Sequence, residues 1–190
     1  MLEKINKIDT ELLIYLNGLG STTWDGFWMF MTTTVYSVPF YLIALYFVYK
    51  IYGTKKTLYA LLFIAILITA SDQLSNAFKY GFGRLRPCHN EEVKGLIRLV
   101  KDSCGGYYSF FSAHASTSMA IVVYFALLIK SKVKYFALFL IFWAVLIGYS
   151  RIYIGVHYPF DVLFGFTVGG TIGFAIYLLF NVFIKKYIDK

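Results

Sequence analysis

Three basic side chains, Lys79, Arg86 and Arg151, lie beside long apolar segments, where a charged group is costly and therefore marks a candidate functional position. Arginine binds phosphate by paired hydrogen bonds, and lysine acts on it as a point charge. Three such cations can converge on one tetrahedral dianion. These residue types therefore favour a site that recognises a phosphate group.

A second group of polar residues supplies the parts of a nucleophilic reaction. His157 lies just before Pro159, which suits the first turn of a helix, and Asp161 falls inside that turn. Asp161 can therefore reach one nitrogen of His157, fix its tautomer and leave the other nitrogen as a nucleophile. His114 remains for proton transfer to a leaving oxygen. Ser112 is placed to cap the next helix, whose free N–H groups would face the same anion.

Each of these residues also has a structural interpretation when it is taken alone. The basic residues could be interfacial anchors for lipid headgroups, His114 could be a buried hydrogen-bonded histidine, and His157 with Asp161 could be a structural pair. Their joint occurrence at one membrane level, in the order cation–cation, Ser–His, Arg–His–Asp, favours the catalytic interpretation. No metal site and no cofactor are expected, because the histidines and acids lack the spacing of a two-metal phosphatase.

Two of these stretches resemble signature motifs of the type 2 phosphatidic acid phosphatase family, which shares its core with vanadium haloperoxidases. The first family motif, K-x6-R-P, matches at Lys79, Arg86 and Pro87. The third motif, S-R-x5-H-x3-D, matches from Ser150 to Asp161. The spacing of the residues in both motifs is very specific to this family.

The second family motif, P-S-G-H, is only half present. Ser112 and His114 match its serine and histidine, whereas Phe111 and Ala113 replace the proline and the glycine. The glycine of the motif is flexible and its N–H approaches phosphate, so Ala113 is a departure at a functional position. The resemblance to the family covers residues 58–180, which we expect to form its core.

The resemblance implies a helical bundle with an outward-facing site, a covalent phosphohistidine and no metal cofactor. It makes His157 the nucleophile, His114 the acid and Asp161 the partner that orients the nucleophile. The residues that it implies for phosphate binding are Lys79, Arg86, Ser112 and Arg151.

The composition indicates that a membrane must position these residues. Of the 190 residues, 59% are hydrophobic and only 15% are charged, and the mean hydropathy is +0.65. We therefore expect a single all-α membrane domain over residues 1–190, a polytopic helical bundle of about five transmembrane helices. Each helix must cross a hydrocarbon core about 30 Å thick and satisfy its own backbone hydrogen bonds. The predicted spans are residues 27–49, 58–78, 113–129, 135–156 and 160–184.

The N-terminal residues 1–24 predict a different element, a helix over residues 1–20 that lies in the membrane interface. Apolar residues recur there at helical spacing from Leu2 to Leu16. This stretch does not read as a cleavable signal peptide, because acids interrupt it and no small-residue cleavage site follows. The charged residues fall mostly between the apolar ones: Glu3, Lys4, Lys7, Asp9 and Glu11.

Basic residues predict the orientation of the bundle. Those in the two short connections and after the fifth span share one side, which the positive-inside rule places in the cytoplasm. The loop over residues 79–111 then faces the periplasm or exterior, and we expect a multi-pass protein of the bacterial cytoplasmic (inner) membrane. The basic residues that carry this prediction are Lys50, Lys55, Lys56, Lys130, Lys132, Lys134, Lys185, Lys186 and Lys190.

Both cysteines of the chain, Cys88 and Cys104, fall in the outward-facing loop. An oxidising compartment outside the cytoplasm would permit a disulfide between them. The alternative is two unpaired thiols, one of them facing lipid or the core.

The motifs indicate that the protein recognises a phosphate group, but they do not identify the lipid that carries it. An undecaprenyl diphosphate phosphatase is the first candidate, because small members of the family commonly act on polyprenyl diphosphates. A phosphatidylglycerophosphate or phosphatidate phosphatase and a lipid A phosphatase follow, and a lipid phosphotransferase or a non-catalytic lipid-phosphate binder belongs to another class. The expected partners are a lipid phosphate and membrane lipids. The net charge of +8 lies at membrane boundaries and in one loop, so no nucleic acid is expected, and no obligate protein partner is evident.

Overall fold

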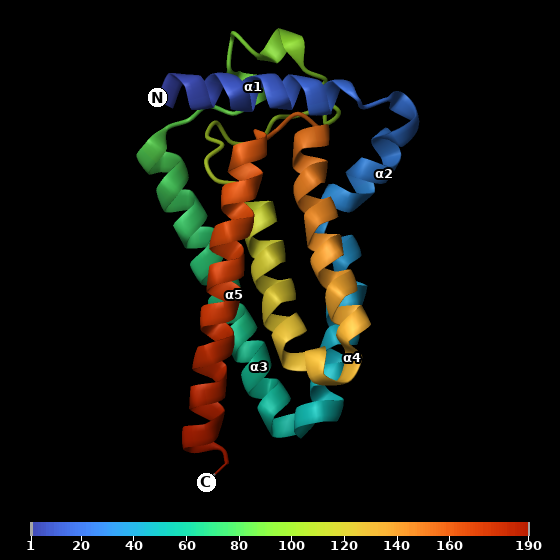
Figure 1. Ribbon diagram of the computed structural model, residues 1–190, viewed down its shortest axis with the longest axis vertical. Helices are drawn as coiled ribbons and strands as arrows, with labels where there is room; N and C mark the ends of the chain where they lie inside the picture. The colour runs from blue at the N-terminus through green and yellow to red at the C-terminus, as the bar shows by residue number, and fades with distance from the viewer. Residues whose placement is uncertain (1, 190) are drawn as a thin grey trace.

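Helices form all the regular elements of the computed structural model, which describes residues 2–189 (Figure 1). Within these residues the only strand-like pairing is an isolated bridge between Leu85 and Tyr108. Met1 and Lys190, which the sequence assigns to the interfacial helix and the cytoplasmic cluster, lie outside the described residues. The all-α prediction is confirmed. The α-helices and short 3₁₀ helices (η) are α1 (Leu2–Gly18), α2 (Thr22–Thr32), η1 (Thr34–Ser37), α3 (Val38–Phe82), η2 (Pro87–His89), η3 (Lys94–Leu96), α4 (Ala113–Tyr153) and α5 (Pro159–Tyr187).

The two longest helices each change direction once. In α3, Gly53 has φ 75° and ψ 174°, a conformation that glycine adopts without steric cost. In α4, Val133 leaves the helical region with φ −137° and ψ 57°. Each helix turns back at its break, so both have a first and a second arm, and α5 runs beside them (Figure 1). The segment 34–82, α4 and α5 are long and apolar enough to cross a membrane.

The first predicted span, residues 27–49, is not one continuous helix. The helix α2 ends at Thr32, Thr33 is extended with φ −87° and ψ 108°, and α3 starts only at Val38. Threonine is β-branched and loses side-chain freedom in a helix, and Pro39 lies in the first turn of α3, where proline is favoured. The run of threonines before a proline explains why the chain leaves the helix there.

The helix α1 lies across one end of the bundle, over the ends of α4 and α5 (Figure 1). Its residues Asp9, Leu13 and Asn17 follow each other at four-residue spacing and are all buried. The Asn17 amide donates to the carbonyl oxygen of Tyr153 at 2.7 Å and accepts the Arg98 N–H at 2.7 Å. Asp9, which the sequence placed among the polar residues of this helix, therefore belongs to its buried face.

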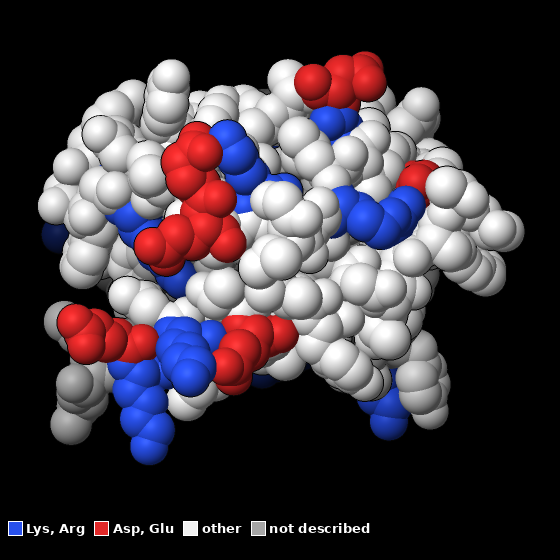
Figure 2. All heavy atoms as spheres, turned by 90° about the horizontal axis from the view of Figure 1, so that it is seen from above, with Lys and Arg blue, Asp and Glu red and all other residues white. Residues whose placement is uncertain are grey.

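The surface at the α1 end carries both signs of charge. Figure 2 looks down on this end and shows acidic and basic side chains interspersed over it. Ion pairs join Lys7 to Glu11 at 3.9 Å and Lys94 to Glu91 at 2.6 Å. Because these pairs are exposed, each contributes little to stability.

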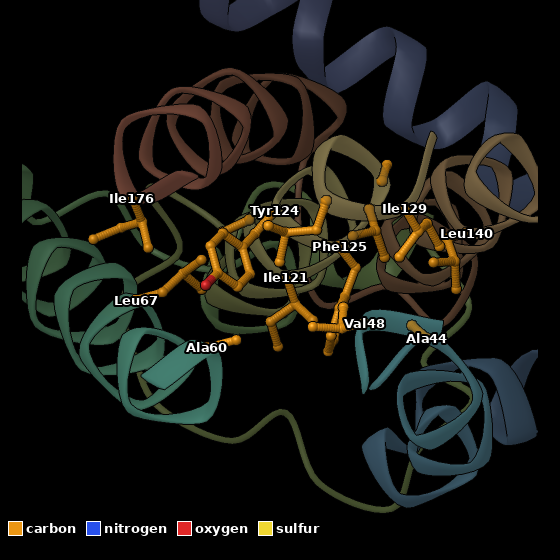
Figure 3. Close-up of a cluster of buried hydrophobic side chains, with 14 of the residues drawn as sticks. Ala44, Val48, Ala60, Leu67, Ile121, Tyr124, Phe125, Ile129, Leu140 and Ile176 are labelled. Carbon is orange, nitrogen blue, oxygen red and sulfur yellow. The ribbon is translucent and has the colours of Figure 1, made fainter. Parts of the chain in front are cut away.

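The apolar core lies between the arms of α3 and α4 and the inner face of α5 (Figure 3). Tyr124 and Leu128 of α4, Leu67 of α3 and Phe180 of α5 are almost completely buried in it. This core fixes the relative positions of the three helices whose ends carry the predicted site.

Glycines bring α5 very close to the first arm of α4. A Cβ atom on Gly165 would lie 2.8 Å from the carbonyl oxygen of Ser112. At Gly169 and Gly173 an added Cβ would lie closer still to backbone oxygens of α4. Small residues repeated every four positions allow this approach of two backbones in a membrane.

We predict that Gly169→Ala destabilises the fold by about 1–3 kcal/mol, because its methyl group has to push α5 away from α4. The matched control is Gly170→Ala, whose Cβ would meet only the Met119 side chain at 4.0 Å. Both changes give the helix the same gain in propensity, so the difference isolates the packing effect. Thermal unfolding in detergent measures it, and equal melting temperatures for the two variants would contradict the prediction.

Candidate active site

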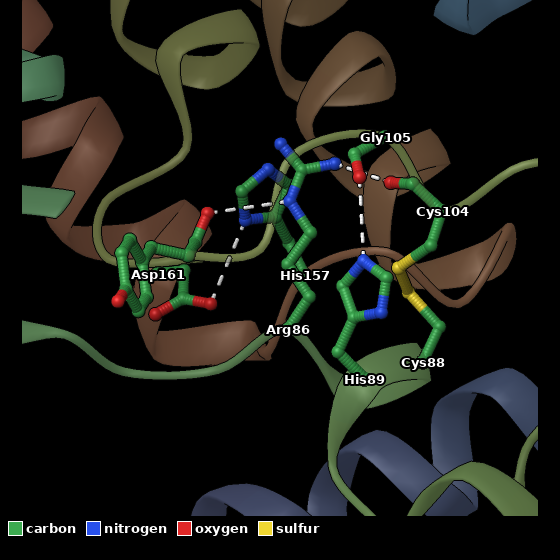
Figure 4. Close-up of a disulfide and its surroundings, with 8 residues drawn as sticks. Arg86, Cys88, His89, Cys104, Gly105, His157 and Asp161 are labelled. Atoms are coloured by element: carbon green, nitrogen blue, oxygen red, sulfur yellow. Dashed lines mark hydrogen bonds and ion pairs between the residues drawn. A yellow bond between two sulfur atoms is a disulfide. The ribbon is translucent and has the colours of Figure 1, made fainter. Parts of the chain in front are cut away.

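The end of α3 positions the residues of the first motif. Gly83 takes a left-handed conformation with φ 62° and ends the helix just after Lys79, whose carbonyl oxygen accepts the Gly83 N–H at 3.0 Å. The chain then passes through Arg84 to Arg86. The Arg86 guanidinium donates to the carbonyl oxygens of Cys104 at 2.5 Å and Tyr108 at 3.3 Å (Figure 4). Because no carboxylate of residues 2–189 is hydrogen-bonded to it, its charge stays available for an anion.

The two cysteines are bonded to each other beside Arg86. The Cα atoms of Cys88 and Cys104 lie 6.0 Å apart, within the usual range for a disulfide, and Figure 4 shows the bond next to the Arg86 side chain. The predicted disulfide is confirmed. It closes the loop whose Cys104 carbonyl oxygen holds Arg86.

Ser112 caps α4 as the sequence predicts. Its side chain accepts the Ala115 N–H at 3.5 Å, and the side chain is fully buried. Its own N–H donates to the carbonyl oxygen of Asp161 at 3.1 Å and is therefore occupied. The free N–H groups at this helix end are those of Ala113 and His114, because the first turn of a helix leaves them without intrahelical partners.

His157 lies in the short connection between α4 and α5, buried at 1% exposure. Its Nδ1 faces the Asp161 carboxylate at 3.6 Å, and its other nitrogen points away from Asp161 (Figure 4). This distance is longer than a hydrogen bond, as is common for catalytic pairs before substrate binds. Burial lowers the pKa of His157 to about 4, although Asp161 opposes this effect. At neutral pH the imidazole is therefore uncharged and carries a free lone pair.

Asp161 is held as an ionised acceptor. It accepts the Tyr158 N–H at 3.0 Å, the Ser109 hydroxyl, and Arg84 Nη1 at 2.9 Å. Because all these groups donate to it, the Asp161 carboxylate is ionised and acts only as an acceptor. The nearby Nδ1 of His157 must therefore be the nitrogen that carries the proton. This arrangement favours the tautomer whose other nitrogen is nucleophilic.

Arg151 lies in the last turn of α4 and is 5% exposed. Its Nη1 donates to the Thr32 hydroxyl of α2, and its Nε is buried without a partner. A buried donor without a partner costs free energy, and an anion in the site would satisfy it. The Arg151 carbonyl oxygen also accepts the N–H of His157 at 3.3 Å, which joins the two residues.

His114 faces a cavity of about 260 Å³ between η1, α3 and α4. Asp72 of α3 lines the same cavity, whereas Lys79 and Arg86 line a second cavity of about 400 Å³. The charges of Arg151, Lys79 and Arg86 all act on His114, as does His157. The structure therefore brings together all seven predicted site residues at the α1 end of the bundle.

Sequence reasoning missed three residues of the site: Asp9, Arg84 and Ser109. Ser109 and Arg84 contact Asp161 directly, and Asp9 accepts Arg84 Nη2 at 2.7 Å. Asp9 could have been found, because it is the one acid that falls in line with the apolar residues of α1 at helical spacing. Arg84 and Ser109 lie in loops, where periodicity gives no signal.

The donor set suits an anion. Among residues 2–189 no three side chains of His, Cys, Asp or Glu converge as ligands of a metal ion would. The site offers cations, free N–H groups and an uncharged imidazole instead, which together can bind a phosphate and attack its phosphorus.

Comparisons with known proteins agree with this chemistry. The sequence profile of the PAP2 superfamily matches residues 56–185. The lipid A 4′-phosphatase of Bacteroides thetaiotaomicron is 35% identical over 181 residues, which cover 94% of this chain and 80% of that protein. The undecaprenyl-diphosphatase of Sulfolobus acidocaldarius is 32% identical over 101 residues, 53% of this chain and 46% of that protein.

A solved structure has the same fold. The PAP2-type phosphatidylglycerolphosphate phosphatase of Bacillus subtilis superposes with a TM-score of 0.71 at 20% identity, over 97% of this chain and 89% of that one. The profile match spans the helices that carry the site, and the similarity to the Bacteroides enzyme extends over nearly the whole chain. This chain is a bacterial membrane phosphatase of the PAP2 superfamily.

Proposed function

We propose that the chain hydrolyses a lipid phosphate through a covalent phosphohistidine on His157. The observation that carries the proposal is the buried, uncharged His157, whose Nδ1 faces Asp161 while Arg86 and Arg151 lie nearby without a carboxylate partner. A purely lipid-binding protein would need the cations but would have no use for the histidine–carboxylate pair. The pair therefore favours catalysis.

In the first step the phosphate group is held by Lys79, Arg86, Arg151 and the helix end capped by Ser112. The Nε2 lone pair of His157 attacks phosphorus, and a P–N bond forms as the P–O bond to the lipid breaks. His114 donates a proton to the departing lipid oxygen. Asp161 keeps the proton on Nδ1 and stabilises the charge that develops on the imidazole.

In the second step water replaces the lipid alcohol. His114, now uncharged, takes a proton from the water, whose oxygen attacks the phosphorus of the phosphohistidine. The P–N bond breaks, its electron pair returns to Nε2, and inorganic phosphate leaves. The cations stabilise the charge on the equatorial oxygens in both transition states.

The substrate that we propose is lipid A carrying a 4′-phosphate. The similarity to the Bacteroides lipid A 4′-phosphatase runs over 94% of this chain, whereas that to the Sulfolobus undecaprenyl-diphosphatase covers 53%. The sequence motifs do not identify the lipid, and undecaprenyl diphosphate comes first there only because small members of the family commonly act on polyprenyl diphosphates. The extent of the similarity reverses this order.

For the membrane arrangement we propose five crossings, by the two arms of α3, the two arms of α4 and α5, with α1 in the outer interface. The breaks at Gly53 and Val133 and the end of α5 lie at one end of the bundle, opposite α1 (Figure 1). Lys56 contacts Asp189 at 2.7 Å there, Lys132 and Lys134 flank the break at Val133, and Lys185 and Lys186 lie in the last turn of α5. This end would be cytoplasmic, and the site would then face the periplasm or exterior.

Purified protein should release phosphate from lipid A 4′-phosphate in excess EDTA, faster than from undecaprenyl diphosphate or phosphatidylglycerophosphate. Vanadate should inhibit, because it resembles the trigonal-bipyramidal transition state. His157→Ala should lower kcat by roughly 10³-fold or more. Colorimetric phosphate release over the substrate panel measures this. Activity that disappears with EDTA and returns with Mg²⁺ would contradict the mechanism, and faster release from undecaprenyl diphosphate would contradict the substrate.

The two histidines should respond differently to the leaving group. A lipid alkoxide needs a proton to depart, and general acid catalysis of this kind is worth about 10²–10⁴-fold. A p-nitrophenolate leaves without a proton at neutral pH, so His114→Ala should be far less damaging on p-nitrophenyl phosphate. His157→Ala should be equally damaging on both substrates. Equal losses for His114→Ala would show that His114 holds phosphate rather than donating a proton.

The orientation is testable with two exposed lysines at opposite ends. In intact cells a membrane-impermeant amine reagent should label Lys101, in the loop beside the site, and spare Lys132, at the break of α4. Both lysines should react in opened membranes, which controls for reactivity. Peptide mass spectrometry measures the labelling, and the reverse pattern in intact cells would overturn the proposed orientation.

A further inference from the structure

A buried ion-pair chain leads from α1 to the site. Asp9 is 0% exposed, although it lies on a helix at the surface of the bundle. Its Oδ2 accepts Arg84 Nη2 at 2.7 Å, and its Oδ1 accepts the N–H of Phe160 at 2.8 Å. Arg84 Nη1 lies 2.9 Å from Asp161 Oδ1. One guanidinium thus bridges the two carboxylates.

The contacts of Arg84 differ from those of the other arginines in the site. Its guanidinium also stacks on the Tyr158 ring, 3.9 Å from the ring centre, so its face and its edges are occupied. Arg86 and Arg151 instead have neutral oxygens as hydrogen-bond partners. The charge of Arg84 is therefore used within the protein, and this residue is unsuited to bind the phosphate.

We propose that Arg84 and Asp9 are positioning residues that act on His157 through Asp161. Arg84 fixes the Asp161 carboxylate so that its Oδ2 stays turned towards His157, and Asp9 fixes Arg84. The proposal rests on the proposed function in one respect, the role of His157 as nucleophile. Its core claim, that the chain controls the tautomer and charge of this imidazole, concerns the resting protein.

Arg84 and Asp9 should shift the pKa of His157 in opposite directions. Arg84 carries a positive charge that disfavours a proton on His157, and Asp9 carries a negative charge that favours one. Loss of Arg84 should therefore raise the pKa of His157, and loss of the Asp9 charge should lower it. The charged and titratable groups that act on His157 are Asp161 on α5, Arg151 and His114 on α4, and Arg86 in the connection after α3. Arg84, Asp9 and Tyr158 lie on the far side of Asp161, where Arg84 contacts all three of Asp161, Asp9 and Tyr158.

The two shifts should differ in size. Burial raises the pKa of Asp9, and Arg84 opposes this effect. Without Arg84, the Asp9 carboxyl takes up a proton more readily and partly offsets the lost positive charge. We expect Asp9→Asn to lower the His157 midpoint by roughly 0.5–1 pH unit and Arg84→Gln to raise it by roughly 0.3–0.5 unit.

Nuclear magnetic resonance of ¹⁵N-histidine-labelled protein in detergent micelles tests this directly. The chain has three histidines, and His89→Gln and His114→Gln assign the His157 signals. The ¹⁵N shifts report the tautomer, and their titration gives the midpoint. Controls with the same charge changes at exposed ion pairs are Glu11→Gln and Lys94→Gln, which should leave the midpoint within about 0.2 unit, because solvent screens them.

Opposite shifts for Asp9→Asn and Arg84→Gln, with the proton on Nδ1 in the wild-type protein, would support the proposal. Shifts of the same sign, or shifts no larger than those of the controls, would overturn it. Arg84→Lys keeps the positive charge and should leave the His157 midpoint near the wild-type value. If Arg84→Gln does not fold, the midpoints of Arg84→Lys and Asp9→Asn are compared instead, and only that of Asp9→Asn should be lowered. The titration does not depend on enzymatic activity. Wild-type protein that lacks phosphatase activity would therefore contradict the proposed function, but the pKa shifts of His157 could still be measured and would still test the positioning role of Arg84 and Asp9.

Discussion

The carboxylate of Asp161 is the constraint around which the α1 end of the bundle is organised. A buried charge is tolerated only where donors surround it, and here the donors come from different parts of the chain. The N–H of Tyr158 comes from the start of α5, the Ser109 hydroxyl from the long loop, and Arg84 from the end of α3. Satisfying this one group therefore brings three separate segments together beside His157.

The arginines of this end divide into two kinds by their partners. Arg84 and Arg98 bind carboxylates, the latter at 2.9 Å from Asp25, and they hold segments of the protein to one another. Arg86 and Arg151 are held by neutral oxygens, so their charges are not cancelled. The arginines that neutralise buried carboxylates are therefore different residues from the arginines whose charge is left for an anion.

Much of this site could be predicted from the sequence because its residues fall in short local groups at or beside helix ends. The spacing of His157 and Asp161 around Pro159 fixes their geometry locally, and the N-cap position of Ser112 follows from the helix that it begins. The three helices that are long and apolar enough to cross a membrane follow from hydropathy. The sequence places Asp9 among the polar residues of its helix, because its partner Arg84 is distant in the chain and only the tertiary fold brings the two together. The break at Thr33 was missed since hydropathy does not register a conformational change within an apolar stretch.

The glycine contacts between α4 and α5 determine which parts of the molecule can move. Backbones in direct contact cannot approach further, and separating them would open an empty space at every glycine, so these two helices form a stiff unit. His114 and His157 both belong to this unit and keep their mutual distance when the rest of the bundle deforms. The cavity at His114 has its other wall in η1 and α3, and there α3 is joined to α4 and the residue before Ser112 by side-chain hydrogen bonds of Ser71 and Ser75. Widening this cavity on the α3 side would break side-chain hydrogen bonds, whereas widening it on the α5 side would separate two backbones in direct contact.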